Sequence, residues 1–301
     1  MKIKKDKICI LGLVRNAEKT IDDDYKRISK AFGLFKEINW IVVESDSKDN
    51  TLDKLKKIRQ SNKLFRFYSL GNLEKKFKLR TERIAYCRNM YLKFLNKEKK
   101  IKSNLKYLVI IDLDGINSKI TRSGVISCWK KKNWDVCLSN QVYKYYDIWP
   151  LRANNWIETD CWQNFKSNLI KNKNYKKAID EEVYSKMIKL KRKSRWINVK
   201  SGFGGLGIYK FNKSLLKFKY SGLTKKGDVV SEHVIFNKLL RNKLKYRLYI
   251  NPNLINSGWN NHTSQLKKNL KNILWQKIKN IIINIFIFIF GTKIYFKVKR
   301  I

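Results

Sequence analysis

The N-terminal part of the chain alternates short apolar runs with longer segments of helical periodicity, and this alternation constrains the fold more than any other feature. β-branched residues, which are typical of buried strands, dominate the apolar runs. A parallel sheet requires such alternation because each strand needs a crossover to reach the next. We therefore expect a Rossmann-like half-domain. Its strands are predicted at 7–14, 40–44, 64–70 and 107–111, and its helices at 17–32, 51–60 and 79–97.

The second half of the chain shows the same two patterns more weakly. A Lys-rich stretch at 166–195 has few apolar residues apart from a predicted helix near 180–190, and we expect it to be a mobile surface insertion. Further strands are predicted at 135–143, 196–199, 205–210 and 246–250, and further helices at 121–132 and 231–242.

The composition limits the class of protein. The chain has 301 residues, of which 43% are hydrophobic, so it should fold as one large domain or two small ones. The chain contains 68 Lys and Arg but only 24 Asp and Glu. The resulting formal net charge of +44 favours polyanionic partners: nucleic acid, anionic membranes or phosphorylated substrates. A coding bias towards Lys, Ile and Asn explains the same excess. The five cysteines form no CxxC pair, which favours a reducing compartment and disfavours a zinc site.

Both ends of the chain bear on membrane association. The N-terminal apolar run is interrupted by Arg15 and Asn16, and it is predicted to be a strand and not a signal peptide. The C-terminal run at 281–290 is shorter than the ~18–20 apolar residues that a spanning helix needs. Lysines flank it and Trp275 precedes it, so it either lies in an anionic membrane interface or is buried against the core. We expect a cytoplasmic protein, or one that is peripheral on the cytosolic face of a membrane.

Two carboxylates follow the predicted buried strand at 107–111. Asp112 and Asp114 are spaced i, i+2, which places them on the same side of an extended chain, and Gly115 allows a tight turn after them. Ligands of open α/β sheets bind at the carboxyl ends of strands, and two hard oxygen ligands there suit Mg²⁺ or Mn²⁺. An ordinary polar turn would have the same residues.

Two neighbouring segments strengthen this interpretation. Glu44 and Asp46 end the predicted strand at 40–44, where a carboxylate can accept hydrogen bonds from a base or a ribose. Arg88 and Asn89 interrupt a helix that otherwise has a core-packed pattern, and guanidinium groups suit a diphosphate. The alternative for the arginines of this helix, Arg80, Arg83 and Arg88, is a solvated face.

The order of four motifs resembles the donor-binding half of GT-A fold glycosyltransferases: KICILGLVRN, VVESDSKDNT, RTERIAYCRN and YLVIIDLDGIN. Three later motifs are similar to the family of capsule-associated, cryptococcal-type mannosyltransferases and their bacterial relatives: YYDIWPLR, SGFGGLGIYK and SEHVIFN. The resemblance covers residues 7–262. It implies a GT-A catalytic domain at 1–265, Rossmann-like with a mixed central sheet, and it leaves 266–301 as a basic and apolar tail.

The resemblance also implies roles in donor binding. Asp114 would coordinate the metal between the donor phosphates, and Asp112 would contact the ribose, the metal or metal-bound water. His262 matches a late metal ligand by position. Asp46 departs from the Gly-containing version of its turn, which leaves its role open. The nucleotide-sugar-binding set implied is Arg15, Glu44, Asp46, Arg83, Arg88, Asn89, Asp112 and Asp114.

On the acceptor side the resemblance implies a second set of residues. Glu232, with Asp228 before it, matches the acidic residue that faces the acceptor. It would act as the base in an inverting reaction, or position the acceptor in a retaining one. His233 is expected to be structural. The sugar- and acceptor-binding residues implied are Asp147, Trp149, Arg152, Gly204 and Gly205, for which an aromatic core cluster and a β-bulge are the structural alternatives.

The expected function is transfer of a sugar from a UDP- or GDP-linked donor to a glycan or lipid-linked acceptor, in surface polysaccharide or glycan synthesis, with Mn²⁺ or Mg²⁺ as cofactor. The tail at 270–301 is expected to meet an anionic membrane surface. A basic nucleic-acid-binding protein is the alternative from another class, and it predicts strongly salt-dependent binding. No nucleic-acid module is visible, so no specific nucleic acid is expected. A nucleotidyltransferase with the same nucleotide-binding half is the third candidate.

Overall fold

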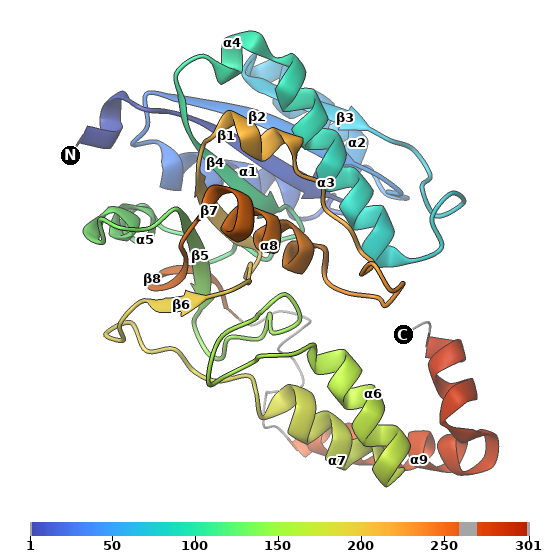
Figure 1. Ribbon diagram of the computed structural model, residues 1–301. Coiled ribbons are helices and arrows are strands. Elements are labelled where there is room, and N and C mark those ends of the chain that lie inside the picture. The colour runs from blue at the N-terminus through green and yellow to red at the C-terminus, as the bar shows by residue number, and fades with distance from the viewer. Residues whose placement is uncertain (1, 259–269, 300–301) are drawn as a thin grey trace.

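An eight-stranded sheet forms the centre of the computed structural model, which describes residues 2–258 and 270–299 (Figure 1). The strand order is β3-β2-β1-β4-β7-β5-β8-β6. The strands are β1 (Lys7–Val14), β2 (Glu37–Glu44), β3 (Phe65–Ser69), β4 (Leu105–Asp112), β5 (Val136–Gln141), β6 (Ile197–Val199), β7 (Leu206–Lys210) and β8 (Leu248–Ser257).

The first four strands are parallel and lie in the order β3-β2-β1-β4. β1 pairs with both of its neighbours, so Leu13 lies opposite Val43 on one side and Asp112 on the other. Successive side chains of β1 enter different hydrophobic clusters, with Ile8 in one and Cys9 in the other. Because both faces of these strands are covered, their sequences are continuous apolar runs and not alternating ones.

Helices cover both faces of the sheet (Figure 1). Ile28 of α1, Leu55 of α2 and Val125 of α5 pack in one cluster, and Leu92 of α3 and Leu240 of α8 pack in the other. The helices are α1 (Ile21–Phe32), α2 (Thr51–Ser61), α3 (Arg80–Lys97), α4 (Lys99–Lys102), α5 (Arg122–Ser127), α6 (Cys161–Asn172), α7 (Tyr175–Ile179), α8 (Glu232–Leu244) and α9 (Leu270–Lys299).

β7 lies between β4 and β5 and runs antiparallel to both. Leu206 pairs with Ile111, so the glycine-rich segment just before β7 lies beside the carboxyl end of β4. This insertion makes the sheet mixed. The predicted fold class, a Rossmann-like α/β domain with a mixed central sheet, is confirmed. The two halves of the sheet meet where the predicted site residues lie.

The structure differs from the predicted element bounds at several ends. The first helix begins at Ile21 and not at 17, because the N–H groups of Thr20 and Ile21 both bond to the carbonyl of Ala17 in a turn. β8 runs on to Ser257 past Pro252. The pairing with β5 shifts register at that point, which accommodates a residue without an N–H.

The Lys-rich stretch at 166–195 is not simply a mobile insertion. Most of α6 and all of α7 lie within or beside it, and Asp160 caps α6 by accepting the N–H groups of Trp162 and Gln163. Phe165 and Leu169 are buried one helical turn apart. This narrow apolar stripe stands among lysines, and the low apolar content of the stretch concealed it.

α9 packs on α6 and α7 along one side only. Ile283, Ile287, Tyr295 and Phe296 are buried, whereas Phe288 is 91% exposed. The segment Lys277–Val298 is long and apolar enough to cross a membrane, by length and composition only, and 22% of its apolar window is buried. The expectation that the chain has no such segment was wrong, because the apolar character continues past the run at 281–290.

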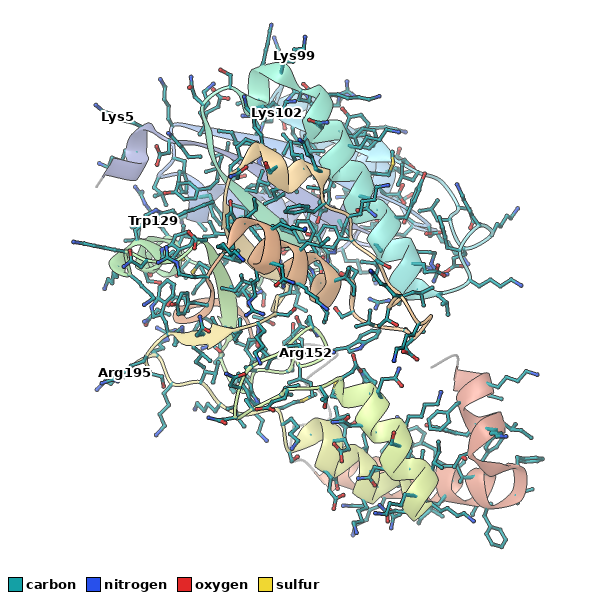
Figure 2. The ribbon with its side chains drawn as sticks, viewed as in Figure 1. Lys5, Lys99, Lys102, Trp129, Arg152 and Arg195 are labelled. Carbon is teal, nitrogen blue, oxygen red and sulfur yellow. The ribbon has the colours of Figure 1, made fainter. Side chains whose placement is uncertain are left out.

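The basic residues are dispersed over the molecule. Figure 2 shows Lys5, Lys99 and Arg195 on different edges of the structure.

Candidate active site

The carboxyl end of β4 carries Asp112 and Asp114 in a fixed turn. The N–H of Leu113, between them, donates to the carbonyl of Leu13 at 2.8 Å, and its side chain is buried. Gly115 has a φ of 84°, and its N–H donates to Oδ2 of Asp24 on α1 at 2.8 Å. A Cβ at Gly115 would lie 2.9 Å from Thr20. These two hydrogen bonds therefore hold the turn, and Oδ1 of Asp114 accepts the N–H of Ile116 at 3.3 Å.

Arg88 joins the two carboxylate groups that the sequence assigned to separate roles. Its Nη2 donates to Oδ1 of Asp112 and its Nε donates to Oε1 of Glu232, each at 2.8 Å. The guanidinium carbon lies 4.8 Å from the ring centre of Phe203. Burial disfavours the charged form, but Asp112 and Glu232 outweigh it and raise the pKa of Arg88. This buried cation stays charged because it has two acidic partners.

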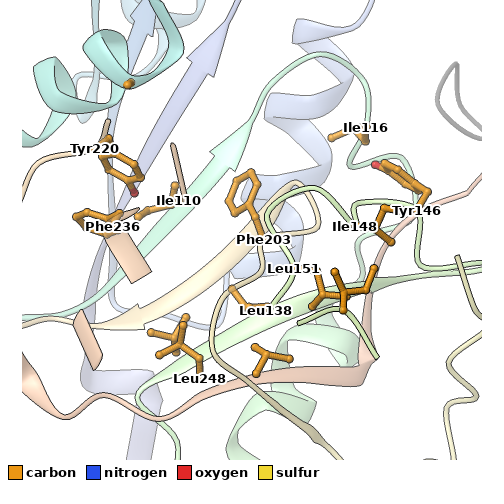
Figure 3. Packing of buried hydrophobic residues seen from close by; sticks show 14 of the residues in the cluster. Ile110, Ile116, Leu138, Tyr146, Ile148, Leu151, Phe203, Tyr220, Phe236 and Leu248 are labelled. Carbon is orange, nitrogen blue, oxygen red and sulfur yellow. The ribbon is translucent and has the colours of Figure 1, made fainter. Parts of the chain in front are cut away.

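The surroundings of Arg88 are aromatic. Figure 3 shows Phe203, Tyr220 and Phe236 in the packed core, and the rings of Tyr220 and Phe236 stack at 3.9 Å. The guanidinium carbon of Arg88 lies 5.9 Å from the ring centre of Tyr220. His233 stacks on Phe203 at 3.9 Å. Burial and the charge of Arg88 lower the pKa of His233, so its imidazole is neutral. This is a structural role, as expected.

The surroundings of Asp114 disfavour its ionised form. Burial and the neighbouring charge of Asp112 raise its pKa to about 6. The charge of Asp112 disfavours ionisation of Asp114, and a cation between the two side chains would relieve the repulsion. The donor set of two hard oxygens fits Mg²⁺ or Mn²⁺. The predicted third ligand, His262, lies outside the described residues, and among those described no group of three or more His, Cys, Asp or Glu could hold a metal.

A cleft of about 240 Å³ opens in front of these carboxylates, and we name it the Asp114 cleft. α3 supplies one wall with side chains at one-turn intervals, so the arginine side chains point into the cleft from one helix face. The charged residues that line it are Arg15, Asp46, Arg80, Arg83, Arg88, Asp112 and Asp114. All of these residues except Arg80 belong to the predicted nucleotide-sugar-binding set.

Two predicted nucleotide-binding residues do not line the Asp114 cleft. Glu44 is 2% exposed, and its oxygens accept from the Ser47 N–H at 2.9 Å and the Ser69 hydroxyl at 2.5 Å. Asn89 exchanges two hydrogen bonds with the backbone of Tyr220. Glu44 therefore shapes its own turn, and Asn89 anchors the segment that precedes α8.

The glycine loop presses against the end of β4. Gly204 and Gly205 have φ of 79° and 84°, and the Gly205 carbonyl accepts the N–H of Asp112 at 3.1 Å. The N–H of Gly204 donates to Oδ2 of Asp147 at 2.7 Å. Burial raises the pKa of Asp147 to about 7, with Asp112 and Glu232 adding to the rise although the Gly204 bond lowers it. Asp147 thus ties the YYDIWPLR segment to the site.

The remaining predicted acceptor residues lie further out. Arg152 pairs with Asp160 at 2.7 Å, and Trp149 donates to the same carboxylate at 3.1 Å. Asp228 is exposed and bonds to Thr224 at 3.3 Å within its turn. Trp149 and Asp228 line a neighbouring hollow of about 480 Å³, not the Asp114 cleft.

Apart from the aliphatic residues of the lining, three residues of the Asp114 cleft were not predicted as site residues: Arg80, Ser45 and Cys87. Arg80 had a usable signal, because it lies three residues before Arg83 and eight before Arg88 on one helix face. Ser45 and Cys87 had no such signal in the sequence. Their Oγ and Sγ atoms lie 3.4 Å apart because α3 packs on the end of β2.

No protein-family model and no curated protein sequence matches the chain. Solved structures with a similar arrangement include three glycosyltransferases. One is the mannosyltransferase PcManGT from Pyrobaculum calidifontis in complex with GDP-Man and Mn²⁺ (12% identity, TM-score 0.43), in which 85% of this chain and 57% of that chain are covered. Another is S. aureus TarS 1-349 in complex with UDP-GlcNAc (14% identity, TM-score 0.43), with 86% and 61% covered.

A third is glucosyl-3-phosphoglycerate synthase from Mycobacterium tuberculosis in complex with Mn²⁺, UDP and phosphoglyceric acid (15% identity, TM-score 0.39), with 93% of this chain and 78% of that chain covered. The chain spans less than two thirds of the length of the first two structures. At these identities and TM-scores the likeness is one of chain architecture. The resemblance to the capsule-associated mannosyltransferase family stays a prediction.

Proposed function

We propose that the protein is a metal-dependent glycosyltransferase that uses a nucleotide-diphosphate sugar, with residues 1–265 as its catalytic domain. The observation that carries the proposal is the Arg88 bridge between Asp112 and Glu232, because it holds a donor-side and an acceptor-side carboxylate on one guanidinium. A structural turn would need neither the bridge nor a charged cleft in front of it.

The arginines of the Asp114 cleft suit the donor diphosphate. Arg15, Arg80 and Arg83 line it together, and guanidinium groups bind phosphate oxygens with paired hydrogen bonds. Arg15 and Arg83 share Glu74, at 2.8 and 3.5 Å, so a dianionic ligand would compete with a single exposed carboxylate. This charge supports a donor linked through a diphosphate, and a UDP- or GDP-linked sugar is the proposed class.

Asp114 and Asp112 would hold Mn²⁺ or Mg²⁺, with His262 as the proposed further ligand. Such an ion neutralises the charge that develops on the leaving diphosphate. The carboxylates are suitably placed because both follow one buried strand and Asp114 has no cation bound to it in the described part of the chain.

In the transfer, an acceptor oxygen forms a bond to the anomeric carbon, and the bond from that carbon to the diphosphate oxygen breaks. The nucleoside diphosphate leaves with the bonding electrons, and the acceptor proton passes to a base. We assign Glu232 the role of positioning the acceptor or taking this proton. Its bond to Arg88 supports the positioning role, because that bond fixes the carboxylate at the first residue of α8. Asp228 and Asp147 are the other acidic residues proposed for this side.

The acceptor is proposed to be a glycan or a lipid-linked glycan in surface polysaccharide synthesis, with the enzyme peripheral on the cytosolic side of a membrane. The tail at 266–301 would lie on that membrane. Ile281, Ile285, Phe288 and Ile289 of α9 are all more than half exposed, and lysines flank them. Such a helix binds anionic interfaces.

Donor hydrolysis tests the proposed function. Purified protein with Mn²⁺ should release UDP or GDP from a nucleotide sugar, and the Asp114→Ala variant should not. If both proteins turn over every UDP- and GDP-sugar equally poorly, the proposal loses its basis.

A further inference from the structure

A second cleft lies next to the Asp114 cleft, and we name it the Lys293 cleft. It measures about 1020 Å³, and its walls come from the segment before α3, from α6, from the loop before α8 and from the end of α9. Gly291 breaks α9 with φ 76° and ψ 162°, and the segment after this bend rises beside α6 (Figure 1). Phe165 of α6 meets Phe296 edge-on at 6.4 Å, which fixes that segment in place.

The walls of the Lys293 cleft are cationic. Lys166 of α6 and Lys293 and Lys297 of α9 line it, together with Arg83. Glu74 is the acidic residue among the described residues of the lining, and two arginines already bind its carboxylate. With Lys78, five cationic side chains therefore line the cleft against one acidic side chain, which favours an anionic ligand.

The Lys293 cleft is continuous with the proposed donor site. Arg83 lines both the Asp114 cleft and the Lys293 cleft. Lys166 and Leu79 line both the Lys293 cleft and the hollow that contains Trp149 and Asp228, which are predicted acceptor residues. An anionic group in the Lys293 cleft would thus lie beside the path along which an acceptor reaches the donor sugar.

Apolar side chains lie in the Lys293 cleft and on the part of α9 before the bend at Gly291. Phe296 lines the cleft, and Lys166 lies 5.2 Å from the centre of that ring. On the same helix Phe288 is 91% exposed and Ile289 is 62% exposed. A free phosphate would use the cations and leave these side chains bare. A ligand with a charged head and a long apolar chain would use both.

We propose that the Lys293 cleft binds the acceptor, and that the acceptor is a lipid with a phosphate or diphosphate head group. The head group lies between Lys166, Lys293 and Arg83, and the chain follows the apolar side of α9 into the membrane. The inference rests on the proposed function, and it selects a lipid phosphate from the broader class of glycan and lipid-linked acceptors.

Vesicle binding tests the inference. Full-length protein is sedimented with phosphatidylcholine vesicles that carry either polyprenyl phosphate or phosphatidylglycerol at equal negative charge. Wild type is expected to bind the polyprenyl phosphate vesicles more tightly. The Lys166→Gln, Lys293→Gln variant should lose that preference, with roughly tenfold weaker binding to them. The matched control, Lys99→Gln, Lys100→Gln, removes the same charge from α4 at the opposite edge (Figure 2) and should keep the preference.

Two results would overturn the inference. Equal binding of wild type to both vesicles would mean a general anionic surface, and displacement by inorganic phosphate as effective as by polyprenyl phosphate would mean a site for free phosphate. The stabilisation of the protein by UDP- or GDP-sugars is measured in parallel by thermal unfolding. If that stabilisation persists while the lipid preference is absent, the lipid acceptor is wrong and the proposed function stands; if the donor has no effect, the proposed function fails first.

Discussion

Arg88 donates from Nε to Oε1 of Glu232 at 2.8 Å, although the two residues are 144 positions apart in the chain. The bond joins the middle of α3 to the first residue of α8. Because the other end of the same guanidinium holds Asp112, the relative position of the two carboxylates is set by one side chain. One buried side chain therefore links the two halves of the site directly through their carboxylates.

Removing the Arg88 bridge should lower the stability of the protein. In Arg88→Met, Asp112 and Glu232 lose their shared cation, and we expect the free energy of unfolding to fall by about 3–5 kcal/mol. Urea unfolding measures the change. The control is Lys56→Met, at a pair whose two side chains are 63% and 64% exposed, where a much smaller loss is expected. Equal losses of unfolding free energy in the two variants would show that the Arg88 bridge stabilises the protein no more than the control ion pair does.

The glycine loop should not tolerate a side chain. In Gly204→Ala the new Cβ would lie 2.7 Å from Oγ of Ser139, at a φ of 79°. We expect a loss of about 2–4 kcal/mol in unfolding free energy, since strain and a clash combine. Gly227 has a φ of 86° with nothing within 4 Å of its added Cβ, so Gly227→Ala isolates the strain. A thermal shift as large for Gly227→Ala as for Gly204→Ala would contradict this account.

Asp24 should make stability depend on pH. Burial raises its pKa to about 6, although the Gly115 N–H and Arg27 lower it. The folded state therefore binds this proton more tightly than the unfolded state, and stability falls as pH rises from about 4 to about 6. Asp24→Asn should remove that part of the fall, while Asp53→Asn on the surface should not. Thermal unfolding temperatures across this range, compared among the three proteins, measure the effect.

The exposed side chains of α9 should contribute to membrane binding and not to the stability of the fold. Phe288→Ser removes a 91% exposed ring, and we expect weaker binding to phosphatidylglycerol vesicles with an unchanged unfolding temperature. Leu64→Ser, at a 39% exposed position on the sheet domain, should leave vesicle binding as it is. If Phe288→Ser lowers the unfolding temperature and leaves vesicle binding intact, α9 packs against protein.

The parallel half of the fold was predictable because its signal is local. The apolar strand of β4 and the carboxylates after it are contiguous in sequence, and sheet topology then brings β1, β2 and β4 together at their carboxyl ends. α6 escaped prediction because its buried positions, such as Phe165 and Leu169, are few and stand among polar residues.

The contacts within the site were not predictable from local pattern. Glu44 looked like a base contact, yet it bonds to Ser47 and Ser69, and only tertiary structure brings Ser69 to it. The Arg88 bridge likewise forms only because β7 and α8 pack near α3 in the folded protein. Sequence spacing identifies the residue types of such a site, and the packing of distant segments decides their partners.

Calorimetric titration with UDP and with GDP, in the presence and absence of Mn²⁺, tests the central claim most directly. The account predicts that one of these nucleotides binds with Mn²⁺ present, that Asp114→Asn weakens this binding by at least about tenfold, or about 1.4 kcal/mol, and that Asp53→Asn leaves it unchanged. Absence of binding by wild type to either nucleotide, or equal affinity of the Asp114→Asn and Asp53→Asn variants, would contradict it.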